Sequence, residues 1–308
     1  MSKKTYLSGS LMLILTAFLW GTTFVAQSDA MTSIGPFTFS AIRSTIGAAA
    51  LFILYLISGK SLRVPFNKEN RALTLKGGLT CGVILFVSAN LQNIGLVNAA
   101  PGKAAFITAL YSLIVPVIGL FLGEKMHFSV WICVAVSIVG FYMLNITPGE
   151  GFGLSIWEIM VLLCAVSYSF HIFACEKYGD CINVVLLSCM QFATTALLSF
   201  IFMFADYTVL SYPSLTLEML GKTWFNLVYA GIFSSAIAYT LQIAGQKRVP
   251  AAAAVLLMSL ESVFAVIAAW IFDPANALST VQLIGCVLIF VSICVSQIPS
   301  SRSIEPAN

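Results

Sequence analysis

Three ionisable side chains lie inside long apolar segments, where each could do chemistry. Glu261 lies about ten residues into one segment, roughly 15 Å deep as a helix, and Arg43 lies about six residues into another. His171 lies near the end of a third. An ionisable group within a bilayer costs roughly 2.5–3.5 kcal/mol, so it usually faces a cavity or a partner. A carboxyl group at this depth can bind substrate or carry a proton, a guanidinium can clamp a carboxylate, and an imidazole can relay protons.

Each of these side chains also has a purely structural alternative. Glu261 could fix helix packing by hydrogen bonds between helices. Arg43 could snorkel to the membrane surface or bond to a neighbouring helix, and His171 could lie at the membrane interface. The sequence leaves these alternatives open.

Uncharged polar and aromatic side chains lie in similar segments. Amides and phenols bind zwitterionic substrates without a large desolvation penalty, and they also join helices by hydrogen bonds worth about 0.6 kcal/mol each. Aromatic rings can wall a cavity, although packing is their usual role. The further candidates for substrate binding or coupling are Asn90, Gln92, Tyr111, Trp20, Tyr239 and Gln242.

Signatures of catalysis and of metal binding are missing from the sequence. We find no phosphate loop, no zinc-protease motif, no nucleophile elbow and no haem or flavin motif. The eight Cys include no C-x-x-C pair and only two His are present, so we predict no metal site and no cofactor, with Cys as small packing residues. An intramembrane enzyme would need clustered catalytic groups, and it stays a remote alternative beside an accessory subunit.

The elements that carry these side chains are long and apolar. The chain of 308 residues is 59% hydrophobic and 9% charged, whereas soluble domains carry about 25% charged residues. Spans of about 20 apolar residues predict membrane helices, which satisfy their own backbone groups in lipid. We predict an all-α integral membrane protein with ten transmembrane helices, at about 8–27, 37–57, 77–97, 101–122, 128–147, 154–174, 182–205, 224–246, 251–272 and 279–297.

The positive charges predict the orientation of these helices. With the N-terminus inside, twelve of the fifteen Lys and Arg fall on inner segments, Lys103 and Lys222 fall outside, and Arg43 lies within a span. Cytoplasmic loops are enriched in Lys and Arg. We therefore expect a multi-pass protein of the cytoplasmic membrane with both termini cytoplasmic. Basic residues form no stripe interleaved with aromatics, so nucleic acid is not an expected partner.

The two halves of the chain resemble each other. A shift of 148 residues lays 37–57 over 185–205, so that Arg43 meets Gln191, and a shift of 151 lays 99–124 over 250–275. Five spans are an odd number, so the second half would enter the membrane inverted, as in many secondary transporters. We predict a first five-helix repeat over 1–148, a second over 149–298 and a disordered cytoplasmic tail over 299–308.

Short motifs in both halves carry a resemblance to a known family. They are Trp20-Gly-Thr-Thr-Phe24, Arg43, Thr108-Ala-Leu-Tyr-Ser-Leu-Ile-Val-Pro116, Leu120-Phe-Leu-Gly-Glu124 and Ser259-Leu-Glu-Ser-Val-Phe264 with Trp270. In their order and spacing the chain resembles EamA-type transporters of the drug/metabolite transporter superfamily. The resemblance implies ten helices as two inverted repeats, a central cavity, alternating access, and export of amino acids or related metabolites.

Together these features predict a secondary transporter and not an enzyme. Its partners would be a small-molecule substrate, the lipid bilayer and, as a hypothesis based on Glu261, protons. Two complete repeats can enclose a cavity, so we expect a monomer. Multidrug or toxic-compound efflux, or uncoupled facilitation by the same fold, is the alternative.

Overall fold

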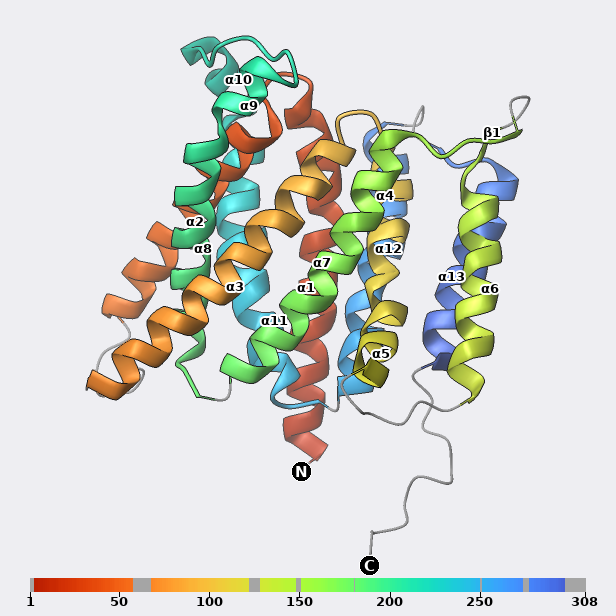
Figure 1. Ribbon diagram of the computed structural model, residues 1–308, viewed down its shortest axis with the longest axis horizontal. Coiled ribbons are helices and arrows are strands. Elements are labelled where there is room, and N and C mark those ends of the chain that lie inside the picture. Colours follow the sequence, from red (N-terminus) through yellow and green to blue (C-terminus); the bar gives the residue numbers. More distant parts are fainter. Residues whose placement is uncertain are drawn as a thin grey trace, which may run out of the picture.

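The computed structural model describes residues 3–57, 68–121, 128–147, 151–179, 181–249, 251–273 and 277–296, and the predicted tail over 299–308 lies outside them. Helices running between the upper and lower ends of the molecule dominate this part of the chain (Figure 1). The two short strands β1 (Ile146–Thr147) and β2 (Gly151–Phe152) pair antiparallel at the upper end.

The helices of the first half are α1 (Lys3–Met31), α2 (Pro36–Ile57), α3 (Lys68–Gly95), α4 (Pro101–Ala109), α5 (Tyr111–Phe121) and α6 (Phe128–Leu144). Those of the second half are α7 (Ile156–Gly179), α8 (Val184–Phe202), α9 (Phe204–Thr208), α10 (Leu217–Tyr229), the π-helix η1 (Ala230–Ala238), α11 (Tyr239–Gln246), α12 (Ala251–Phe272) and α13 (Thr280–Ser296). The first helix begins at the lower end, where the last one ends (Figure 1).

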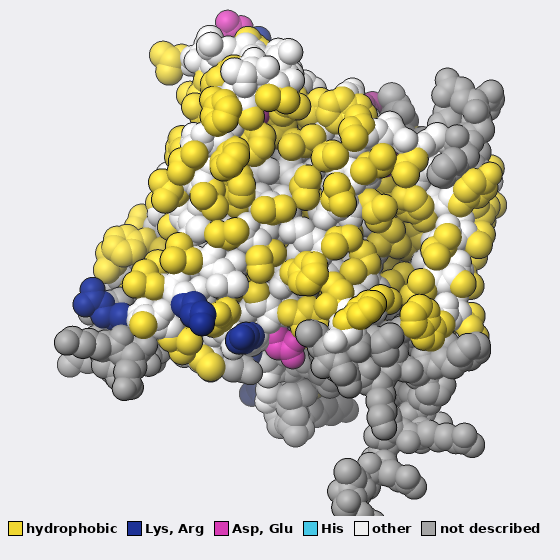
Figure 2. All heavy atoms as spheres, viewed as in Figure 1, with side chains coloured by type: hydrophobic (Ala, Val, Ile, Leu, Met, Phe, Trp, Pro, Cys, Tyr) yellow, Lys and Arg dark blue, Asp and Glu magenta, His cyan; other side chains and the backbone are white. Residues whose placement is uncertain are grey.

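The composition of these helices suits a bilayer. Among the described residues, seven segments are long and apolar enough to cross a membrane, and Trp131–Leu144, Leu256–Phe272 and Thr280–Val295 are shorter apolar helices. Large apolar side chains such as Leu11, Val83 and Ile138 are exposed. Hydrophobic side chains cover most of the face in Figure 2, and Lys and Arg gather along its lower rim. The described part of the chain is helical apart from β1 and β2, and the chain is a multi-pass membrane protein, as the sequence predicted.

Two helices have local irregularities close to the centre of the molecule. The predicted span 101–122 is divided at Leu110 into α4 and α5, and Pro116 inside α5 has no backbone N–H to donate. The span Leu217–Gln246 contains the π-helix η1, whose wider turn shifts the side chains that follow it. Tyr111 follows the first irregularity directly and Tyr239 follows the second.

Close helix pairs hold the bundle together: α1 packs on α12, α2 on α8, α3 on α7 and α8, and α6 on α13. Glycine permits the closest approaches. A Cβ atom at Gly82 of α3 would lie 2.8 Å from the Gln191 carbonyl oxygen of α8. A Cβ at Gly140 of α6 would lie 2.8 Å from the Gly285 carbonyl oxygen of α13, and one at Gly285 would lie 2.6 Å from that of Gly140. Small residues allow helices in lipid to associate in this way.

A buried carboxylate organises the upper end of the molecule. Asp206 of α9 accepts hydrogen bonds from the Phe37 N–H at 3.1 Å, the Thr38 N–H at 2.7 Å and the Thr38 hydroxyl at 2.7 Å. It thereby caps the N-terminus of α2 from the other half of the chain. Burial and the neighbouring Asp206 carboxylate raise the pKa of Tyr212 to about 12. Its hydroxyl therefore keeps its proton and donates a 2.8 Å hydrogen bond to the Met31 carbonyl.

Candidate functional site

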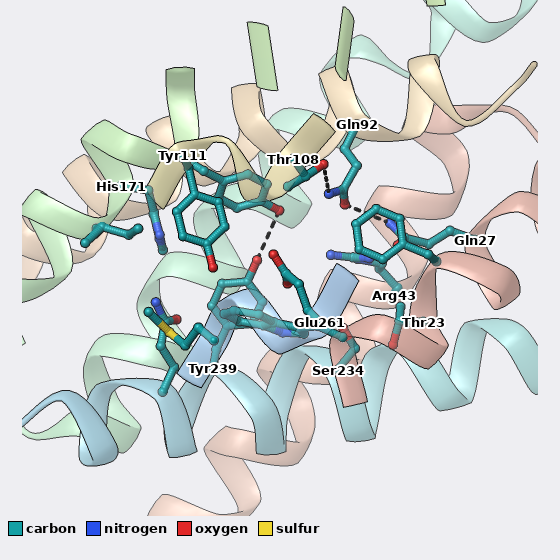
Figure 3. Close-up of a pocket in the computed structure, with 16 residues that line it drawn as sticks. Thr23, Gln27, Arg43, Gln92, Thr108, Tyr111, His171, Ser234, Tyr239 and Glu261 are labelled. Atoms are coloured by element: carbon teal, nitrogen blue, oxygen red, sulfur yellow. Dashed lines mark hydrogen bonds between the residues drawn. The ribbon is translucent and has the colours of Figure 1, made fainter. Parts of the chain in front are cut away.

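A cavity lies among the helices at the centre of the bundle, and residues from both halves of the chain line it. Eight of the nine candidates named from the sequence line this cavity: Trp20, Arg43, Gln92, Tyr111, His171, Tyr239, Gln242 and Glu261. They come from α1, α2, α3, α5, α7, α11 and α12, so the fold brings together side chains that are far apart in sequence (Figure 3).

Arg43 and Glu261 place a guanidinium group and a carboxyl group in one buried space. Their exposed fractions are 3% each, and both side chains point into the cavity in Figure 3. Within the described part of the chain no ion pair joins them, and Arg43 Nε and Glu261 Oε1 have no hydrogen-bond partner. Because a buried charge is costly when unpaired, the two groups are suited to a ligand that meets both. The burial of Arg43 shows that it does not snorkel to the surface.

A row of amides lines the cavity on the side of Arg43. Gln27 Nε2 donates to Asn93 Oδ1 at 2.7 Å and to Gln92 Oε1 at 3.4 Å. Gln92 Nε2 in turn donates to the Thr108 hydroxyl at 3.3 Å. These bonds connect α1, α3 and α4 and fix the amides in place, so that polar groups are presented to the cavity without a net charge.

Aromatic rings form a second part of the wall. The rings of Trp20 and Tyr239 meet edge to face at 4.8 Å, and Phe192 packs on Tyr239 at 5.1 Å. The hydroxyls of Tyr168 and Tyr239 lie 3.2 Å apart. The indole N–H of Trp20 and the hydroxyl of Tyr111 are buried and have no hydrogen-bond partner among the described residues. This part of the wall thus offers both apolar surface and unused hydrogen-bonding groups.

His171 lies in the protein interior, where it lines the cavity, and not on the outer surface of the bundle. Only 1% of the residue is exposed, and its Nε2 lies 3.0 Å from Gln191 Oε1 of α8. The predicted span ended at residue 174, whereas α7 continues to Gly179 and so places His171 deeper. Cys175 is buried one turn further along α7 and contacts the same imidazole.

Asn90 is the candidate that does not line the cavity. Its side-chain amide donates to the Phe86 carbonyl at 2.8 Å and to the Ser199 hydroxyl of α8 at 3.4 Å. Residues two positions apart on a helix point about 200° away from each other, so Asn90 and Gln92 cannot both face the same cavity. The contacts of Asn90 therefore match the structural alternative, in which amides join helices by hydrogen bonds.

Several lining residues were not among the sequence candidates. They are Thr23, Phe24, Gln27, Thr108, Tyr168, Ile172, Ser234 and Met258. The sequence contained a signal that could have found some of them. The shift of 148 residues that aligns the two halves pairs lining residues of α1 with lining residues of α7. The pairs are Trp20 with Tyr168, Thr23 with His171 and Phe24 with Ile172.

The cavity is small and most of the residues around it are buried. Its volume is about 40 Å³, whereas sites for small molecules usually measure about 300–1,000 Å³. Towards the lower end, Leu13, Val249, Ala254 and Met258 form an apolar cluster. An amino acid would fit only after the helices around the cavity move apart. Among the described residues no group of His, Cys, Asp or Glu could hold a metal ion.

Known proteins resemble this chain over nearly its whole length. The model of the EamA-like transporter family matches it twice, over residues 7–146 and 155–297. An uncharacterized transporter of Archaeoglobus fulgidus is 28% identical over 284 residues, which cover 92% of this chain and 83% of that protein. The uncharacterized transporter YoaV of Bacillus subtilis is 24% identical over 300 residues, covering 94% and 97% of the two chains.

A solved crystal structure has the same fold. It superposes with a TM-score of 0.66 at 24% sequence identity, and the match covers 94% of this chain and 96% of that one. The family match and the relatives named as transporters point to transport and not to catalysis. With its apolar helices and central polar cavity, the chain belongs to the EamA-like transporter family, within the drug/metabolite transporter superfamily.

Proposed function

We propose that this protein is a secondary transporter of amino acids or related small zwitterionic metabolites, and that it exports them across the cytoplasmic membrane. The observation that carries the proposal is that one buried cavity holds both Arg43 and Glu261, and that Arg43 Nε and Glu261 Oε1 have no hydrogen-bond partner among the described residues. An amino acid has a carboxylate for a guanidinium and an ammonium group for a carboxylate. Bound between them, it would satisfy both charges while neutral amides contact its other atoms.

The proposal includes ten membrane spans arranged as two inverted five-helix repeats. The family model matches once in each half. The helix contacts also support the repeat, because contacting pairs have a contacting counterpart when the halves are exchanged: α1 with α12 corresponds to α7 with α4, and α3 with α7 corresponds to α11 with α1. The pairs α2 with α8 and α6 with α13 correspond to themselves. In Figure 1, α1 ascends from the lower end whereas α7 descends from the upper end.

Alternating access follows from such an arrangement. Two related halves surround one central cavity, and each half supplies part of the gate at either end. The cavity described above is small and lined mostly by buried side chains, as we would expect of an intermediate between the inward-open and outward-open states. We further propose that the lower end, with its Lys and Arg, faces the cytoplasm, and that one chain is the working unit.

Coupling to protons would use Glu261. This carboxyl group lies between Arg43 and the Tyr111 hydroxyl in the cavity wall (Figure 3). A carboxyl that exchanges its proton for the substrate ammonium group would couple export to proton entry. The same residue would then serve for both substrate binding and coupling.

A second candidate function is efflux of organic cations. Trp20, Tyr168 and Tyr239 present aromatic rings near a carboxylate, and such an arrangement attracts cations through the ring faces. Arg43 in the same cavity disfavours this function, because its charge repels a cationic drug that brings no anion of its own.

The test is counterflow in proteoliposomes that are each loaded with one unlabelled amino acid of a panel, with the same amino acid added outside in labelled form, with and without a pH gradient. Wild type should accumulate at least one amino acid, whereas Glu261→Gln and Arg43→Gln should insert normally and lose most of this transport. Lys222→Gln is the matched control, because Lys222 pairs with Glu218 on the surface, where its side chain is 65% exposed. Unchanged transport in both cavity variants would contradict the proposed site, and no accumulation of any amino acid would contradict the substrate class.

A further inference from the structure

A buried ion pair outside the cavity connects the two halves of the chain. Lys103 Nζ lies 2.9 Å from Glu158 Oε1, and the two side chains are 11% and 10% exposed. The other oxygen of Glu158 accepts hydrogen bonds from the backbone N–H of Ser155, at 2.9 Å, and from the Ser155 hydroxyl. Lys103 therefore meets a Glu158 carboxylate that the start of α7 already holds in one orientation.

The position of this pair relates it to the opening of the cavity. Lys103 lies in the first turn of α4 and Glu158 in the first turn of α7, and both helices start at the upper end (Figure 1). The same two helices supply cavity residues further down, with Thr108 on α4 and His171 on α7. If α4 and α7 separated at their upper ends, this wall of the cavity would open towards the upper surface, and the ion pair would have to break.

The lower end of the molecule has no equivalent ion pair among its described residues. Under the proposed repeat, the shift of 151 places Lys103 on Ala254, and the shift of 148 places Glu158 on Ser10. Ala254 is 1% exposed within the apolar cluster that also contains Leu13. The Ser10 hydroxyl donates to the Tyr6 carbonyl of its own helix at 3.0 Å. The two ends are therefore closed by different chemistry, a charged pair above and apolar packing below.

We propose that Lys103 and Glu158 form a latch that holds the upper, outer end closed and so biases the empty transporter towards opening to the cytoplasm. This inference rests on the proposed alternating access and orientation. Separating α4 from α7 requires the loss of a charge-assisted bond that is largely shielded from water, whereas the lower end opens by separating apolar side chains. This asymmetry suits an exporter, because the cavity of the empty transporter then opens to the cytoplasm, which supplies the substrate.

The test measures access to Cys164, which neighbours a cavity residue and lies below the ion pair on α7. This cysteine is buried on α7 beside Thr108. A membrane-impermeant maleimide is added to the outside of cells or of sealed right-side-out vesicles, and the modification of each cysteine is followed by mass spectrometry. Cys181 is exposed between α7 and α8 at the lower end, so it should stay unmodified and thereby confirm sidedness.

Lys103→Met and Glu158→Gln should each accelerate the modification of Cys164 about tenfold, because each leaves a shielded charge without its partner and favours the open outer end. The double variant with Lys103→Glu and Glu158→Lys should return the rate to within about threefold of wild type, since the pair is restored with its charges exchanged. Lys222→Met breaks the exposed pair with Glu218 at the same end and should leave the rate unchanged.

Wild-type rates in both single variants would overturn the latch. Accelerated rates that the exchanged pair does not reduce would also overturn it, because the effect would then come from lost packing. Size-exclusion profiles in detergent identify variants that fail to fold, and Lys103→Gln then replaces Lys103→Met with the same expected acceleration. Lys103→Arg keeps the positive charge and should keep the wild-type rate. The maleimide assay uses no amino acid. An error in the proposed substrate class would therefore leave its result unchanged, whereas an error in the proposed latch would change it.

Discussion

At the scale of single residues, the depth of a charge in an apolar segment was the most useful signal in the sequence. Glu261 and Arg43 were chosen for this reason, and both line the central cavity. Depth alone does not give direction around the helix, and for this reason Asn90 was chosen wrongly as a cavity residue. Gln27 was missed because the predicted first span ended there, whereas α1 continues to Met31.

The shape of the Arg43 side chain should matter as well as its charge. Arg43→Lys keeps the charge but cannot form two parallel hydrogen bonds with a carboxylate. We expect the amino-acid concentration for half-maximal counterflow to rise about tenfold, the effect of losing about 1.4 kcal/mol of binding. Arg71→Lys, at the exposed start of α3, is the control and should match wild type. An unchanged half-maximal concentration in Arg43→Lys would exclude bidentate recognition.

Asp206 should contribute stability although it lies far from the cavity. Its carboxylate accepts the two backbone N–H groups that start α2, so Asp206→Ala should lower the free energy of unfolding by about 1–2 kcal/mol. Asp206→Asn keeps one acceptor oxygen and should lose less. Thermal unfolding in detergent measures both, and equal midpoints for all three proteins would show that the cap adds no stability.

At the scale of elements, the apolar segments predicted the helices well but not their interruptions. The span 101–122 contains a break at Leu110, and the span 224–246 contains the whole of η1. Neither interruption has a strong local signal, because Leu110 is an ordinary helix former and the π-helix has no proline. Contacts with other helices determine such interruptions. These contacts cannot be derived from a single sequence.

The pair of α6 and α13 should depend on its two glycines. Gly140→Val would place side-chain atoms where the Gly285 backbone already lies, so the two helices would have to separate. We expect a clear loss of thermal stability in detergent. Gly221→Ala is the matched control, since a Cβ atom there meets nothing within 4 Å, and alanine favours a helix over glycine. If both variants unfold at the wild-type temperature, this contact is not tight in the membrane.

At the scale of the whole molecule, the distribution of Lys and Arg predicts an orientation that reporter fusions can test. In bacteria, green fluorescent protein fused after Gly179 should fluoresce, because we place the end of α7 in the cytoplasm. Alkaline phosphatase fused after Phe152 should be active, because we place β2 outside. The exchanged reporters at the same two positions should be silent. The reverse pattern would invert the proposed topology and with it the assignment of the latch to the outer end.

A cavity of about 40 Å³ bounded mostly by buried side chains also protects the membrane potential. One elementary charge crossing the membrane releases about 2.3 kcal/mol per 100 mV. A continuous water column that conducts ions would therefore dissipate the membrane potential. In the closed state the apolar cluster of Leu13, Val249, Ala254 and Met258 interrupts such a column below the cavity. A cell could therefore hold many copies of this protein without leaking ions, and its respiratory energy would be spent only when cargo moves.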